Sequence, residues 1–167
     1  MRRVPLLLAV VVVAACGSSK NTAPPPPTTT APPSPTAGIP GGEALYVGGN
    51  WAVVLAGDQA VAVHLVNTTW HTDRSGRVRI AVLGPKPGSV APKLPQVAAE
   101  LRAPRALVET GLWVDGKELV VKGGGSPLHA TIYGAPTGNL SRGQHVAIAY
   151  GRTATTGTAR AWSFRVR

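Results

Sequence analysis

Apolar and polar side chains alternate with a period of two along most of the chain after residue 43. In one clear case Val78, Ile80 and Val82 alternate with Arg77 and Arg79. Because successive side chains of a strand point to opposite faces, this pattern predicts strands that have one face in water. Other alternating or β-rich runs cover residues 51–56, 60–66, 97–102, 112–114, 118–122, 128–133, 145–150 and 160–166. No amphipathic helix of useful length interrupts them, so we predict an all-β protein.

Turn-forming residues separate the predicted strands. The Asp115-Gly116 pair between two β-rich runs is the best hairpin candidate, because a type I′ turn needs two residues that tolerate positive φ. Other breaks rich in glycine or proline lie at residues 57–58, 75–76, 123–127, 136–138 and 157. Several short strands joined by such turns indicate a sandwich of two sheets.

Four motifs in residues 78–167 sharpen the fold prediction. They are a Leu-Gly-Pro-Lys-Pro-Gly turn at 83–88, Trp-Val-Asp-Gly at 113–116, Leu-Ser-Arg-Gly-Gln-His at 140–145 and Trp-Ser-Phe-Arg-Val at 162–166. Their order resembles that of a bacterial immunoglobulin-like domain. The resemblance implies an immunoglobulin-like antiparallel β-sandwich in which His145 hydrogen-bonds the backbone of a turn. It implies nothing about activity, because one fold serves many functions.

Residues 43–77 lie outside these motifs. Residues 51–56 and 60–66 predict a β-hairpin, with Trp70 in the loop that follows. We expect this N-terminal hairpin extension to dock on the sandwich. A folded part of about 125 residues can bury its own core as one domain.

The N-terminus has the pattern of an export signal. Arg2 and Arg3 precede the apolar run 4–13, which is too short to cross a bilayer core that needs about twenty residues. The Val-Ala-Ala-Cys sequence ending at Cys16 resembles a bacterial lipoprotein signal. This resemblance implies removal of residues 1–15 and attachment of lipid, such as palmitate, to Cys16. An ordinary signal peptide, cut after small residues, is the alternative.

Cys16 is the only cysteine of the chain. Lipidation would therefore leave no thiol for a disulfide, a nucleophile or a thiolate metal site. Residues 16–42 follow as the lipidated cysteine and a linker rich in proline and threonine, in which Ile39 is the only large hydrophobe. Such a segment cannot bury enough apolar surface to fold, and its residues 17–40 would reach roughly 75 Å as polyproline II. We expect the protein to be lipid-anchored on the extracytoplasmic face of the cell membrane.

Candidate catalytic and metal-binding residues are few. The spacing of His71 and Asp73 places both on one face of an extended chain, and His64 lies one strand earlier. A hydrolase or metal-binding site near these residues is our alternative hypothesis, although a polar loop explains them more simply. Ser126 and His129 lack the Gly-x-Ser-x-Gly elbow of a hydrolase, so a turn between two strands is favoured there. We predict no enzyme and no cofactor.

The tryptophans suggest two different roles. Trp162 shares a face with Phe164 and is expected in the core. Trp113 lies on the face opposite its neighbours and is either an exposed binding anchor or a cover for the core. Together with Trp70 and His71 it forms our set of candidate partner contacts.

The formal net charge of +10 indicates an acidic or anionic partner. The arginines are spread singly along the predicted strand faces without interleaved aromatic residues, and the protein is expected outside the cell, so nucleic acid is not the predicted partner. An envelope protein or an anionic wall polymer fits better, although dispersed charge also keeps an exported domain soluble. We predict a membrane-anchored, non-enzymatic lipoprotein of a Gram-positive envelope, whose head is an interaction or structural module. An accessory subunit of a separate enzyme is a further alternative.

Overall fold

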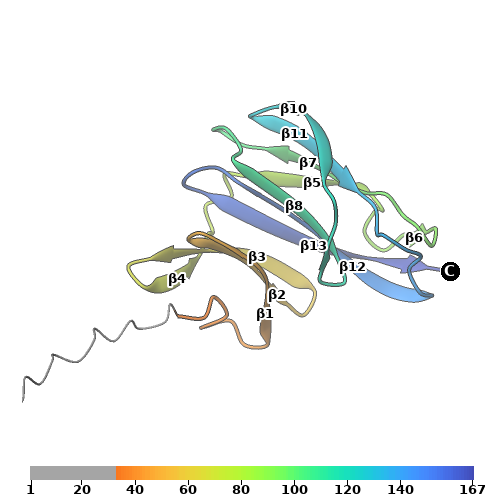
Figure 1. The fold of residues 1–167 in the computed structure, drawn as a ribbon, viewed down its shortest axis with the longest axis horizontal. Helices are drawn as coiled ribbons and strands as arrows, with labels where there is room; N and C mark the ends of the chain where they lie inside the picture. Colours follow the sequence, from red (N-terminus) through yellow and green to blue (C-terminus); the bar gives the residue numbers. More distant parts are fainter. Residues whose placement is uncertain (1–32) are drawn as a thin grey trace, which may run out of the picture. The chain divides into compact units, whose positions relative to one another are not determined.

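The computed structural model describes residues 33–167, which form thirteen β-strands (Figure 1). The predicted signal, Cys16 and most of the linker lie outside these residues. Within residues 33–167 there is no helix that has the length and apolar character needed to cross a bilayer. The all-β prediction is confirmed for this part of the chain.

Three sheets account for the strands, and all their pairings except one are antiparallel (Figure 1). The N-terminal sheet contains, in order, β1 (Gly42–Gly48), β2 (Trp51–Ala56), β3 (Gln59–Val66) and β4 (Thr69–Thr72). The back sheet contains β10 (Lys122–Ser126), β11 (His129–Gly134), β7 (Val97–Arg102) and β5 (Arg79–Gly84). The central sheet contains β6 (Val90–Ala91), β13 (Gly157–Val166), β12 (Gly143–Arg152), β8 (Glu109–Val114) and β9 (Lys117–Glu118), with β6 parallel to β13.

The strand order of the back and central sheets is that of an immunoglobulin-like sandwich. Strands β5, β7, β11 and β10 take the places of A, B, E and D in one sheet, and β8, β12 and β13 take those of C, F and G in the other. The two-residue turn between β8 and β9 has positive φ at Asp115 (49°) and Gly116 (76°), as the hairpin prediction requires. The predicted immunoglobulin-like β-sandwich is therefore confirmed.

The sandwich core lies between the back and central sheets. Leu101 of β7, Leu112 of β8 and Phe164 of β13 are at most 1% exposed. Trp162 is also buried, and its Nε1 donates a hydrogen bond to the carbonyl of Pro85 over 2.9 Å, which satisfies its polar atom. The prediction that Trp162 and Phe164 are core residues is thus confirmed.

The central sheet is apolar on its second face as well, and the N-terminal sheet covers that face. Trp113, Ile148 and Tyr150 form a second buried cluster with Trp51 and Val53. Alanines at positions 60, 62, 159 and 161 also contribute to this cluster, so small side chains lie on both sides of the contact. The N-terminal sheet therefore forms a third layer on the sandwich, as the docking expectation required.

The N-terminal extension is larger than the hairpin predicted from the sequence. Strands β2 and β3 form that hairpin, but β1 and β4 pair with its two edges. Trp70, expected in a loop, lies on β4 opposite Leu65. Strand β4 is only four residues long and its alternation is correspondingly weak, which explains why the sequence pattern missed it.

Removing the N-terminal sheet should expose the second apolar face of the sandwich. We expect a chain that begins at residue 77 to bind a dye specific for apolar surface and to aggregate. The physical reason is that each large side chain returned to water costs about 1.5–3 kcal/mol. Dye fluorescence and size-exclusion chromatography would measure this, with a chain that begins at residue 33 as the control. A soluble monomer that binds no dye would contradict the three-layer arrangement.

Candidate functional site

The residues of the alternative site hypothesis do lie together. His64, His71 and Asp73 line one hollow of about 300 Å³, here called the histidine hollow, with the rest of its wall from Trp51, Thr72, Ser75, Thr155 and Thr156. Strand pairing explains the arrangement, because Trp51 lies opposite His64 and His64 lies opposite His71 across three neighbouring strands. The His64 ring stacks on Trp51 with centroids 4.4 Å apart and an interplanar angle of 13°.

Two of these three polar side chains make hydrogen bonds within the fold. His64 Nε2 lies 2.6 Å from Nδ2 of Asn50, so the amide donates and the imidazole accepts. Asp73 accepts from the backbone N–H of Ser75 over 2.8 Å and from that of Gly157 over 2.7 Å. His71 is exposed. Among the residues that the structure describes, no three His, Cys, Asp or Glu side chains are grouped so that they could hold a metal ion.

Asp73 fastens the end of the N-terminal sheet to the first residue of β13. Burial raises the pKa of its carboxyl, but the N–H groups of Ser75 and Gly157 oppose this and hold the pKa below its ordinary value of 3.8. Those N–H groups bind the charged form, so they stabilise the ionised carboxylate. The role of Asp73 in this structure is therefore that of a structural acceptor between two layers.

Replacing Asp73 with Ala should lower the free energy of unfolding by about 1.5–3 kcal/mol at neutral pH, because two charge-assisted hydrogen bonds are lost. The folded pKa is depressed, so this contribution is present above pH 3.8 and is lost as the pH falls through the folded value. Urea denaturation of both proteins across the acidic range would measure it, with the exposed Glu43→Ala as the control. A difference that stayed constant down to the lowest pH would contradict this role.

His145 occupies the corner that the immunoglobulin-like motif predicted. It is 5% exposed, its Nε2 donates to the carbonyl of Ser141 over 2.9 Å, and its Nδ1 lies 2.7 Å from Oδ2 of Asp115. The other carboxylate oxygen of Asp115 accepts from the N–H of Val146 over 3.0 Å. The predicted hydrogen bond from His145 to a turn backbone is confirmed. A histidine here does what a tyrosine does at the corresponding corner of antibody domains.

Both ring nitrogens of His145 face acceptors, so only the protonated imidazolium satisfies both. Burial lowers the pKa of this histidine, but Asp115 and the Ser141 carbonyl outweigh burial and raise it above the ordinary value of 6.5.

A raised folded pKa means that His145 stabilises the protein most below pH 6.5, and that this contribution is lost as the pH rises through the folded value. We therefore expect His145→Gln to cost more stability in mildly acidic solution than in alkaline solution. Thermal unfolding of both proteins over this pH range checks the sign. The exposed His71→Gln is the control variant.

The candidate partner contacts do not form one surface. Trp70 and His71 are neighbours on β4 and therefore point to opposite faces of the sheet. Trp70 packs beside Ile39 and donates from Nε1 to the carbonyl of Pro33 over 2.7 Å. Trp113 is 2% exposed beneath the N-terminal sheet. The suggestion that Trp113 contacts a partner is wrong in this fold, because the third layer covers it.

Ser126 and His129 lie opposite each other at the tip of the β10–β11 hairpin. His129 Nε2 is 2.7 Å from Oε1 of Glu100 on the neighbouring strand. The expectation of a turn over residues 123–127 is wrong: residues 122–126 form the edge strand β10, and the turn is confined to residues 127 and 128. Because glycine-rich segments are usually turns, the sequence pattern did not indicate this strand.

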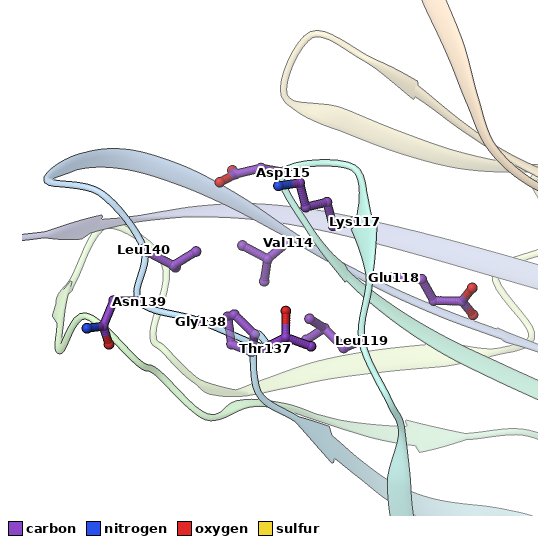
Figure 2. Close-up of a pocket in the computed structure, with 10 residues that line it drawn as sticks. Val114, Asp115, Lys117, Glu118, Leu119, Thr137, Gly138, Asn139 and Leu140 are labelled. Carbon is purple, nitrogen blue, oxygen red and sulfur yellow. The ribbon is translucent and has the colours of Figure 1, made fainter.

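A further hollow of about 240 Å³ lies between the β8–β9 turn and the segment that follows β11 (Figure 2). Figure 2 shows Val114, Leu119 and Leu140 around its middle, while the carboxylate of Glu118 points away. The Asp115 carboxylate at its rim is held by His145 and Val146. This carboxylate therefore has a structural role.

Arginines gather at one end of the back sheet, which the sequence pattern did not indicate. Arg77, Arg79 and Arg105 line an open hollow of about 540 Å³, here called the arginine hollow, together with Ser75, Gly76 and Pro104. Arg79 of β5 lies directly opposite Arg102 of β7. The interpretation of the arginines as singly scattered is therefore wrong for this end of the back sheet. The Arg-Val-Arg alternation was visible in the sequence, but the pairing of β5 with β7 was not.

Comparisons with known proteins give little beyond the fold. No family model and no curated protein matches the chain. Among solved structures, two tandem immunoglobulin domains of titin resemble it, with 5% sequence identity, a TM-score of 0.36 and coverage of 77% of this chain and 83% of that chain. A resemblance this weak carries no argument, so the fold assignment rests on the strand order and the core described above.

Proposed function

We propose that this chain is a membrane-anchored, non-enzymatic lipoprotein of a bacterial cell envelope, and that its immunoglobulin-like head is an interaction or structural module. The anchor is Cys16, proposed to carry the lipid, and the proposed linker after it leads to the head. This linker is shorter than expected, because Pro33 and Ile39 already contact the N-terminal sheet. The partner class is an envelope protein or an anionic wall polymer, and the site of action is the extracytoplasmic face of the membrane.

One structural observation supports this function most. The titratable side chains best suited to chemistry make hydrogen bonds within the fold. Asp73 bonds the backbone of β13 from the end of the N-terminal sheet, and Asp115 and His145 bond each other and a turn at the start of β12. A head whose titratable groups hold its own backbone is suited to presenting a rigid surface. The N-terminal sheet adds rigidity, because it buries a second core against the sandwich.

The anchor makes a direct prediction. We expect Cys16→Ala to leave the precursor uncut or to release the head into the medium, because the residue that receives the lipid is gone. Fractionation of cells into membrane, wall and medium, followed by immunoblotting, measures this. Ser18→Ala, two residues away, is the matched control and should stay with the membrane. A Cys16 variant that is cut and stays at the membrane like the unaltered protein would contradict the lipoprotein proposal.

The second candidate function, hydrolysis or metal binding near His64, His71 and Asp73, is favoured by their common hollow. It predicts stoichiometric metal in the purified full chain, and loss of that metal in His71→Ala. Elemental analysis of both proteins measures the metal bound per chain. Metal that binds and is lost on this substitution would overturn the non-enzymatic proposal, whereas metal-free protein would favour it.

A further inference from the structure

The arginine hollow is made by two short segments that strand pairing brings together. Residues 75–79 lead into β5 and contribute Arg77 and Arg79, and residues 104–105 follow β7 and contribute Arg105. Because β5 and β7 are antiparallel neighbours, the start of one lies beside the end of the other. Three arginines therefore line the hollow at one end of the back sheet.

Local acidic groups leave most of this charge unbalanced. Glu100 accepts from Nε of Arg102 and contacts His129, so its charge offsets that of Arg102. The Asp73 carboxylate is turned to the backbone N–H groups of Ser75 and Gly157. Within residues 33–167, no ion pair involves the arginines at 77, 79 and 105 that line the hollow, and no acidic residue is part of its wall.

The arrangement also opposes stability. Like charges directly opposite each other on neighbouring strands are destabilising, and Arg79 lies directly opposite Arg102. Glu100 offsets the charge of Arg102, but no ion pair among residues 33–167 offsets that of Arg79. A local rule broken in this way is expected at a functional or strained site. An external anion would supply the missing compensation.

The geometry points to a phosphate-bearing ligand: we propose that the arginine hollow binds successive phosphate groups of a linear polyanion. Guanidinium forks bind both carboxylate and phosphate in bidentate fashion. Three forks around one hollow favour phosphate, because its several oxygens accept from more than one arginine at once. The hollow is open, and its arginines come from two segments, which suits a flexible chain of such groups. This proposal names a ligand for the envelope-contact function above and rests on it only for the source of the polymer.

The test uses the purified full chain in neutral detergent, with long-chain polyphosphate, inorganic phosphate, a single-stranded DNA oligonucleotide and vesicles containing anionic phospholipid as probes in titration calorimetry. We expect polyphosphate to bind, with an affinity that falls as salt rises because counterions are released. Inorganic phosphate, which offers one group only, should bind far more weakly.

The matched variants separate a site from diffuse charge. Arg79→Ala with Arg105→Ala should weaken polyphosphate binding about tenfold or more, because hydrogen bonds to charged groups are lost. Lys93→Ala with Arg142→Ala removes the same charge from exposed positions outside the hollow and should change it less than about twofold. Replacing Arg79 and Arg105 by Lys keeps the charge but removes the forks, and we expect an intermediate loss. If thermal unfolding shows that the alanine pair does not fold, the lysine pair is the variant that tests the hollow.

Four outcomes would overturn the proposal. They are no binding of polyphosphate, equal loss in the two alanine pairs, inorganic phosphate bound as tightly as polyphosphate, and vesicles bound in place of the polymer. Single-stranded DNA is also a linear chain of phosphate groups, so its binding would support the phosphate chemistry and change only the source of the polymer. None of these measurements depends on the lipid anchor. A failure here therefore differs from a failure of the Cys16 prediction, which is measured in cells.

Discussion

Burial of both faces of the central sheet is the constraint on which the rest of this structure depends. Strand β12 carries Ala147 and Ala149 into the sandwich core, and between them Ile148 points to the other side; all three are fully buried. An immunoglobulin-like sandwich alone would leave Ile148, Trp113 and Tyr150 in water, so a third layer is required. The N-terminal sheet supplies it, and for this reason the extension and the sandwich form one compact unit.

Polar contacts fix how the third layer sits on the second. The Tyr46 hydroxyl on β1 donates to the Glu109 carboxylate on β8, and Arg152 Nε of β12 donates to the same carboxylate over 2.5 Å. At another point the Asp73 carboxylate holds the N–H of Gly157. Apolar burial is non-directional, whereas these bonds have fixed geometry, so together they define one docking position between sheets that could otherwise slide.

The sandwich was predictable because its signals are local. Alternation predicted the strands, Asp115-Gly116 the hairpin and His145 the corner, and each needs only a few neighbouring residues. Strands β1 and β4 and the burial of Trp113 depend on which faces meet, which a period of two does not specify. The unbroken apolar run 146–150 did carry a sign of double burial, since strands covered on both faces lose their alternation. The arginine hollow required the β5–β7 pairing, a contact between residues far apart in the sequence.

The position of the covering sheet at the start of the chain has a kinetic consequence. Strands β1 to β4 pair only with their sequence neighbours, so they can form quickly as the chain emerges from its N-terminus. Their inner face, with Trp51 and Val53, then has no partner until β8, β12 and β13 arrive from much later in the chain. Folding from the N-terminus would thus pass through an intermediate in which the N-terminal sheet has formed but its apolar face is still exposed. A chaperone that shields this side would act before the sandwich closes.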